Sequence, residues 1–323
     1  MTIPDKVRSV LKRQRLLTKG EKVVLGVSGG PDSVAMLYIL TGLSKEWRLA
    51  LHVAHLDHML RKDSYKDREF VEGLARKFGL EFSSGEINVR ALAKKGSLEE
   101  AAREARLGFL FGVARDIKAG KIALGHTLDD QAETVLMRII RGTGLYGLSG
   151  ILPKREIAGF QIIRPLLALR RSEIEAYLRQ KKIKPLFDPS NSDDIYFRNK
   201  IRRRLLPLLE KDYNRNIKEV LANLATSAGY DYDYLWSVAE KKAGADAGSI
   251  NLKRFLRLPV SLQRLMLRLC IQRLNGDTRR LTFKHVSEME DLIFNRPVNS
   301  VVDLPRGLSF SKRPSCLVFY KRK

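Results

Sequence analysis

Hydrophobic positions in the N-terminal part of the chain form short continuous runs that alternate with stretches of helical periodicity. The continuous runs lie at 22–27, 48–56 and 121–126. The helical patterns that follow them lie at 33–43, 63–78 and 128–140. This alternation predicts an α/β fold with a doubly wound, mainly parallel sheet that helices cover on both faces. In such folds, ligands bind beside the carboxyl ends of the strands.

The pattern changes beyond Tyr213, where the segments become mainly helical. The last stretch, 300–323, instead shows the short apolar runs and turn residues of strands. A chain of 323 residues commonly forms two domains, because one core rarely organises so many residues. We therefore expect one domain at 1–210 and a smaller C-terminal domain at 211–323, with the boundary near Pro207 to Arg215.

Charge and cysteine content narrow the possible classes of protein. Lysine and arginine outnumber the acidic residues by 60 to 36, a formal net charge of +24. This favours a polyanionic partner, although a basic surface that only confers solubility would have the same composition. Cys270 and Cys316 are too few and too far apart for a disulfide framework, a zinc knuckle or a CxxC redox pair. Because the N-terminus lacks an apolar signal core and no long apolar run occurs, we expect a cytoplasmic protein with no membrane segment.

A loop with two glycines joins the first predicted strand to its helix. It consists of Ser28, Gly29, Gly30, Pro31, Asp32 and Ser33. Its spacing fits neither the P-loop GxxxxGK[ST] nor the dinucleotide motif GxGxxG. The glycines allow a sharp turn that brings backbone N–H groups close to an anion, and the serines and the helix N-terminus add further donors. We therefore expect phosphate here, with Asp32 holding a Mg²⁺ ion against it; the alternative is a structural turn that Asp32 caps.

Several longer strings carry a family resemblance. SGGPDS after a hydrophobic strand resembles the pyrophosphate loop of the N-type ATP pyrophosphatases. Further strings are HLDHMLR at 55–61, SLEEAAREARLGFL at 97–110, GHTLDDQAET and its continuation at 125–151, RPLL at 164–167 and DPSNSDDIYFRNKIRRRLLP at 188–207. Together they resemble the tRNA(Ile)-lysidine synthetase family from Lys22 to about Pro207, and the resemblance weakens beyond Tyr213.

The resemblance implies an enzyme that uses ATP and Mg²⁺ to adenylate the wobble cytidine of a tRNA(Ile) with a CAU anticodon. The side-chain amine of free lysine then displaces AMP, and the product is lysidine. The loop at 28–33 and His126 are implied to bind the nucleotide, with Asp32 as metal ligand and catalytic residue. The segment beyond residue 210 corresponds to the family's tRNA-binding extension, with room for one module.

Acidic residues stand at the start of the helix predicted at 128–140. Asp130 and Glu133 are three residues apart and therefore share one helix face, whereas Asp129 points elsewhere. Such a pair suits the lysine step, because it can bind the substrate ammonium and permit the loss of its proton. The alternative is that these acids only complement the helix dipole. His126, at the preceding strand end, either touches phosphate or caps the turn.

Two arginines lie on a helix that we expect to begin near Ser97, where a capping-box pattern occurs. Arg103 and Arg106 are three residues apart and share a face, from which they can stabilise the triphosphate during catalysis. The ordinary explanation is pairing of Arg103 with Glu100. The histidines of HVAHLDH do not predict a metal site, because two of them face opposite sides of a strand and no cysteine accompanies them.

Residues 198–218 carry a high density of basic side chains. They are Arg198, Lys200, Arg202, Arg203, Arg204, Lys211, Arg215 and Lys218. A basic track that leads to the catalytic pocket suits an RNA stem-loop whose target base must be splayed out for chemistry. Arg198, Asn199 and Arg202 fall in the shared string RNKIR and are candidates both for tRNA binding and for the active site. Arg203 and Arg204 are better candidates for contacts with the tRNA backbone.

Two other classes of protein remain as alternatives. A tRNA thiolase of the same superfamily would use catalytic cysteines or a CxxC-bound iron–sulfur cluster, and the two distant cysteines can supply neither. A non-catalytic RNA-binding protein would fit the charge but would not require the intact SGGPDS and DDQAET strings.

Overall fold

The computed structural model describes residues 1–59, 61, 63–92, 98–186, 197–244, 248–278 and 280–322. They form two compact units, Met1–Gly229 and Tyr230–Lys323. This division falls later than the expected boundary near Pro207 to Arg215. The reason is that the first part of helix α11 (Ile217–Ala243) contributes Leu221 and Ala225 to a core of the first unit. The assignment of catalysis to a domain at 1–210 and of tRNA binding to a domain at 211–323 stays a prediction.

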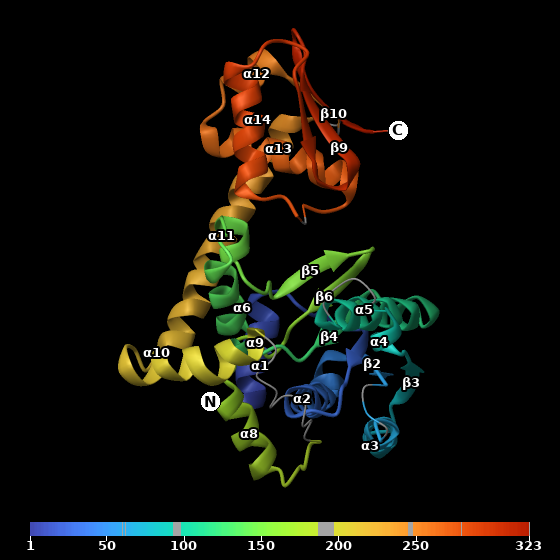
Figure 1. Cartoon of the computed structure of the whole chain (residues 1–323). Helices are drawn as coiled ribbons and strands as arrows, with labels where there is room; N and C mark the ends of the chain where they lie inside the picture. Colours follow the sequence, from blue (N-terminus) through green and yellow to red (C-terminus); the bar gives the residue numbers. More distant parts are fainter. Residues whose placement is uncertain are drawn as a thin grey trace. The chain divides into compact units, whose positions relative to one another are not determined.

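A six-stranded sheet forms the centre of the first unit (Figure 1). In sheet order its strands are β3 (Glu81–Glu86), β2 (Ala50–Asp57), β1 (Lys22–Gly26), β4 (Lys121–Leu124), β6 (Phe160–Ile163) and β5 (Lys154–Ile157). Neighbouring strands are parallel, except that β5 pairs antiparallel with β6. The prediction of a mainly parallel sheet is confirmed, and the carboxyl ends of β1, β2 and β4 lie at one edge.

Helices cover both faces of this sheet because alternate strand residues are apolar on each side. On one face, Val23 and Leu25 of β1 pack with helices α1 (Ile3–Arg13), α2 (Pro31–Trp47), α3 (Tyr65–Lys77) and α8 (Arg171–Gln180). On the other face, Val24 packs with α5 (Leu98–Asp116). The short helices α4 (Val89–Leu92) and α7 (Leu145–Leu148) lie in connections. The helices expected at 33–43, 63–78 and 128–140 all form.

A further core joins α6 (Leu128–Ile140) to segments much later in the chain. Ala132 and Val135 of α6 pack with Ile201 and Leu206. The later segments are α9 (Phe197–Lys200), a π-helix at Ile201–Leu205, α10 (Leu206–Asp212) and α11. This packing places the basic tract against the acidic start of α6, so residues from two distant motifs meet.

The second unit is a helical layer on a four-stranded antiparallel sheet. Its elements are the end of α11, then β7 (Ser249–Asn251), α12 (Leu252–Leu256), α13 (Val260–Asn275), α14 (Phe283–Asn295), β8 (Val301–Leu304), a 3₁₀ turn at Pro305–Gly307, β9 (Leu308–Lys312) and β10 (Cys316–Lys321). Its core includes Phe255, Met289 and Phe310. The predicted order of helices followed by short strands is confirmed, and β7 is an addition. Among the described residues no helix combines the length and apolar character needed to cross a membrane.

Candidate active site

The loop after β1 is held in one conformation by its own hydrogen bonds. Gly29 has φ of 89°, which residues with a side chain rarely adopt, and a Cβ there would lie 2.8 Å from Cδ1 of Leu186. The Ser28 N–H donates to Oγ of Ser33 at 3.1 Å, and that hydroxyl donates to the carbonyl of Gly30 at 3.0 Å. Gly30 is the N-cap of α2 and makes no side-chain cap bond. The turn therefore presents a preformed helix N-terminus, which is a site for an anion.

Asp32 lies in the first turn of α2 and is the acidic group nearest this helix N-terminus. Its Oδ1 atom is buried and has no hydrogen-bond partner within the described part of the chain. Burial raises the pKa of its carboxyl to about 6, although Arg171, with Nη1 at 3.7 Å from Oδ2, acts in the opposite direction. A buried carboxylate oxygen without a partner beside a phosphate-binding turn fits a Mg²⁺ ligand, because Mg²⁺ is usually held by one or two carboxylates plus substrate phosphates.

The start of α2 also touches the connection that follows β4. A Cβ on Gly125 would lie 3.0 Å from the backbone carbonyl oxygen of Asp32 and 3.1 Å from Cα of Ser33. Backbone cannot move aside as a flexible side chain can, so this contact requires glycine. It brings the segment with His126 and the first turn of α6 directly beside the phosphate loop.

Asp130 and Glu133 form the centre of a four-residue ionic cluster. Arg198 donates from Nη2 to Oδ1 of Asp130 at 2.8 Å and from Nε to Oε2 of Glu133 at 2.7 Å. Arg202 donates from Nε to Oε1 of Glu133 at 2.5 Å and from Nη2 to Oε2 at 3.0 Å, and it reaches Asp130 at 3.3 Å. We call these four residues the Arg–acid cluster. The predicted shared face of Asp130 and Glu133 is thus confirmed by common partners.

Electrostatics keep Asp130, Arg198 and Arg202 of the Arg–acid cluster charged. Burial by itself would raise the pKa of Asp130, but Arg198 and the cap bond from Thr127 hold it below the ordinary value. Burial likewise opposes the charge of Arg198 and Arg202, yet the two carboxylates raise the pKa of both guanidinium groups. Glu133 is only 1% exposed. An ionised acid this deeply buried requires such partners, because an unpaired buried charge is very costly.

Asp130 has a second, structural role, and Asp129 has a different set of partners. The Thr127 N–H donates to Oδ2 of Asp130 at 2.9 Å, which completes a capping box at the start of α6. Asp129 instead accepts from the backbone N–H of Arg171 at 2.7 Å and pairs with Lys218 at 3.1 Å. Asp129 therefore joins α6 to α8 and α11, as expected from its different helix face.

Further buried nitrogen atoms without partners surround the same edge of the sheet. They are Nε of Arg106, Nε2 of His55, Nδ1 of His58 and Nδ1 of His126, each without a hydrogen bond in the ranges that the structure describes. Burial lowers the pKa of His126 to about 3, although Asp130 opposes this, so the ring is neutral at pH 7. Burial, Arg103 and Arg198 together lower the pKa of Arg106. Buried polar atoms without a hydrogen-bond partner are rare in native proteins, and each points to a bound ligand, ion or water.

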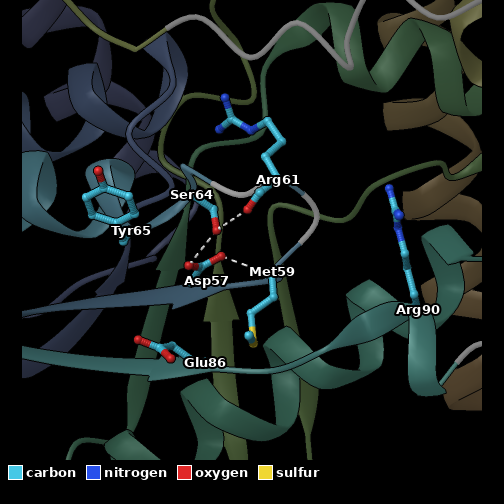
Figure 2. Close-up of a pocket in the computed structure, with 7 residues that line it drawn as sticks. All are labelled: Asp57, Met59, Arg61, Ser64, Tyr65, Glu86 and Arg90. Carbon is cyan, nitrogen blue, oxygen red and sulfur yellow. Dashed lines mark hydrogen bonds between the residues drawn. The ribbon is translucent and has the colours of Figure 1, made fainter.

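A pocket opens at the carboxyl ends of β2 and β3 (Figure 2). It has a volume of about 390 Å³ and is lined by Asp57, Met59, Arg61, Ser64, Tyr65, Glu86 and Arg90. Asp57 accepts from the Met59 N–H at 2.7 Å and from the Ser64 hydroxyl at 2.8 Å, which fixes the turn after β2. This volume lies within the range of small-molecule sites. Because β2 is the parallel neighbour of β1, the pocket lies at the same edge of the sheet as the phosphate loop.

The remaining predicted residues fall into two groups. Arg103, Arg203 and Arg204 have exposed side chains, whereas Asn199, which follows Arg198 in the chain, is buried. The capping box expected at Ser97 and the family string at 188–196 lie outside the described residues. In the described ranges no group of three or more histidine, cysteine or acidic side chains could hold a metal ion.

The sequence pattern assigns no role to Arg171, His55 or His58. Arg171 contacts both Asp32 and Asp129 from the start of α8. Arg171 follows the RPLL string at 164–167 by only a few residues, so that string is the sequence feature that could have drawn attention to it. The two histidines belong to the HLDHMLR string, which is a family feature without an assigned contact.

Comparison with known proteins gives consistent matches. The family model described as the PP-loop domain matches residues 2–209. The chain is 38% identical over 324 residues to the tRNA(Ile)-lysidine synthase of Clostridioides difficile, covering 97% of this chain and 70% of that protein. It is also 38% identical to the tRNA(Ile)-lysidine synthase of Geobacillus kaustophilus, covering 94% of this chain and 68% of that protein.

Among solved structures, the U34-tRNA thiolase NcsA from Methanococcus maripaludis is similar with a TM-score of 0.59 and 22% identity. The similarity covers 71% of this chain and 76% of that chain. At this identity the match supports the fold and not the reaction.

Proposed function

The chain belongs to the tRNA(Ile)-lysidine synthase family of PP-loop proteins, and from this premise we propose how its site works. It ligates free lysine to C2 of the wobble cytidine of tRNA(Ile) with a CAU anticodon, using ATP and Mg²⁺. The products are lysidine, AMP and pyrophosphate. The observation that supports this most directly is the close approach of two functional groups: the phosphate loop with Asp32, and the buried acidic pair on α6.

In the first step the C2 oxygen of cytidine attacks the α-phosphorus of ATP and pyrophosphate leaves. The loop at 28–33 and the N-terminus of α2 bind the phosphates in this proposal, which the absence of a side-chain cap bond at Gly30 supports. Bound Mg²⁺ would neutralise charge on the phosphates, and Asp32 is the residue that would hold it. Arg106, with a buried nitrogen that lacks a partner, is placed to stabilise the charge that develops on the triphosphate. The neutral His126 can donate or accept a hydrogen bond at the same edge.

In the second step the side-chain amine of lysine attacks C2 and AMP leaves. Asp130 and Glu133 supply the negative charge that recognises the substrate ammonium. The lowered pKa of Asp130 makes it a weak base at neutral pH. The nearby guanidinium groups favour the neutral amine, because like charges lower the pKa of an ammonium. The cluster thus recognises lysine, and the proton that the ammonium loses passes to solvent water, because Asp130 is too weak a base to keep it.

The pocket at the ends of β2 and β3 is large enough for a nucleoside. We propose that it receives the adenosine of ATP, since strands in a sheet lie about 5 Å apart and the phosphates bind beside the neighbouring strand. Tyr65 and Met59, which are about half exposed, offer flat and polarizable surface to a base. We also propose that the reaction takes place in the cytoplasm.

The proposed function predicts a characteristic dependence on substrates. With a tRNA(Ile) transcript that carries the CAU anticodon, pyrophosphate release should require tRNA, ATP and Mg²⁺. AMP release should additionally require lysine, and a transcript with another wobble base should support neither. Chromatography of both products measures this. Release supported by a sulfur donor without lysine would indicate a thiolase, and tRNA binding without any pyrophosphate release would indicate a non-catalytic RNA-binding protein.

Arg203 and Arg204 are proposed to bind the tRNA backbone, because both are exposed on the π-helix that carries Arg202 into the Arg–acid cluster. Replacing both by alanine should weaken tRNA binding. It should also reduce the slope of log affinity against log salt by about 0.7 to 0.9 for each phosphate that an arginine no longer neutralises. Filter binding over a series of salt concentrations measures both quantities.

A matched control replaces two exposed arginines at the other edge of the sheet. Arg76 lies in the last turn of α3 before β3, and Arg115 lies in the last turn of α5 before β4, so both are near the amino ends of strands. The double alanine variant of these residues removes the same charge and should bind tRNA with an unchanged salt slope. Equal effects of the two double variants would show only a general influence of net charge.

A further inference from the structure

The oxygens that are proposed to bind the lysine ammonium are already occupied in the structure. Both oxygens of Glu133 accept from guanidinium nitrogens, at 2.5 to 3.0 Å. One oxygen of Asp130 accepts from Arg198 and Arg202, and the other accepts from the cap residue Thr127. A substrate ammonium can therefore reach these carboxylates only if a guanidinium group leaves.

The charge balance leads to the same conclusion. Two carboxylates and two guanidinium groups give the Arg–acid cluster no net charge, so it has little attraction for a cation. If one arginine leaves, the remaining three groups carry one net negative charge in a buried site. The lysine ammonium then replaces the guanidinium and restores neutrality without leaving a charge unpaired.

Arg202 is better suited to leave than Arg198. It lies on the π-helix Ile201–Leu205, an irregular turn of the type that is frequent at functional sites. Arg198 is additionally within 3.9 Å of Glu99. The charge of Arg202 also acts on Asp32 in the first turn of α2. Phosphates bound at that turn would offer Arg202 another anion.

We propose that Arg202 is a positioning residue that occupies the lysine site until ATP binds, and that its transfer to the nucleotide phosphates opens the site for lysine. This inference rests on the proposed function and adds an order of binding to it. Lysine and ATP are then coupled, and each increases the affinity for the other by the same factor. Lysine is excluded before the nucleotide that activates the tRNA is in place.

The test measures lysine binding directly by equilibrium dialysis of the full chain with radiolabelled lysine. The wild type should bind lysine at least ten times more tightly in the presence of a non-hydrolysable ATP analogue and Mg²⁺ than in their absence, within the usual range of such couplings. Arg202→Gln should bind lysine without nucleotide about as tightly as the wild type does with it. Arg202→Lys, which keeps the charge, should restore part of the dependence on the analogue.

The control is Lys200→Gln, which removes an exposed charge two residues away and should leave the coupling unchanged. An affinity of the wild type for lysine that does not depend on the analogue overturns the proposal, and this result requires no variant to fold. No gain of lysine binding by a folded Arg202→Gln protein also overturns it. Lysine-dependent AMP release by the wild type, assayed separately, shows whether the proposed function itself holds.

Discussion

Glu133→Gln should raise the concentration of lysine needed for half-maximal AMP release by roughly one to two powers of ten, while adenylation of tRNA continues. A charge-assisted contact to an ammonium contributes about 1.5 to 3 kcal/mol, which corresponds to such a factor. Glutamine preserves the shape of this almost completely buried side chain. The substitution removes the negative charge that both arginines share. It should therefore weaken lysine binding while it largely preserves the structure of the site.

Single-turnover reactions with radiolabelled ATP, first without and then with lysine, follow adenylated tRNA and released AMP separately. The matched control is Glu99→Gln, which removes a carboxylate 3.9 Å from the same Arg198 but on an exposed side chain. Exposed ion pairs contribute little, so this variant should keep the lysine requirement of the wild type. If Glu133→Gln instead abolished the adenylated intermediate, the acidic pair would belong to the nucleotide site.

The parts of this site that sequence could predict are those set by local spacing. The glycine loop between β1 and α2 follows from a strand, a turn and a helix start within a few residues. The shared face of Asp130 and Glu133 follows from helical periodicity alone. Both features depend on neighbours along the chain, so their geometry is contained in a short segment.

The contacts that sequence could not predict join distant segments. Arg198 and Glu133 are 65 residues apart, and only the packing of α6 against the π-helix brings them together. The sequence leaves Arg198 and Arg202 as candidates both for tRNA binding and for the active site, and only the packing shows that their side chains are directed into the acidic pair. The division at Gly229 likewise depends on packing of α11, since helical periodicity does not show which core each turn of a long helix joins.

The sequence also contains no residue pattern that predicts the pairing of β5 with β6. β5 and β6 form a hairpin whose turn contains Ala158 with φ of 52° and Gly159 with φ of 80°. Two positive φ values match the twist of a tight hairpin. Asparagine or aspartate normally occupies the first of these positions, and alanine does not mark it. The pattern therefore does not predict the antiparallel edge of the sheet.

Asp32→Ala should abolish Mg²⁺-dependent pyrophosphate release while tRNA binding remains largely intact. The carboxylate is the proposed protein ligand of the metal that neutralises the triphosphate, and the basic side chains exposed on the π-helix are unchanged by the substitution. Pyrophosphate release over a Mg²⁺ titration, together with filter binding of tRNA, measures the two properties. Turnover at the wild-type rate would exclude Asp32 from metal binding.

Replacing Asp32 should abolish activity, but its raised pKa predicts that the same replacement stabilises the fold. Its carboxyl has a pKa of about 6 in the folded chain against 3.8 for the ordinary group. The folded state therefore holds this proton more tightly than the unfolded state, and the ionised group destabilises the fold at every pH above about 6. A difference of about two units corresponds to about 3 kcal/mol as an upper bound.

In EDTA at pH 7.5, Asp32→Asn should thus increase the free energy of unfolding, and the gain should shrink as the pH falls from 6 towards 4. Urea unfolding at several pH values measures this, with Asp63→Asn on the exposed turn before α3 as the control. A gain that did not depend on pH would show that charge burial is not its cause. In the absence of Mg²⁺, the inactive variant should thus be more stable than the wild type. The reason is that the buried charge that destabilises the fold is the same charge that the metal requires.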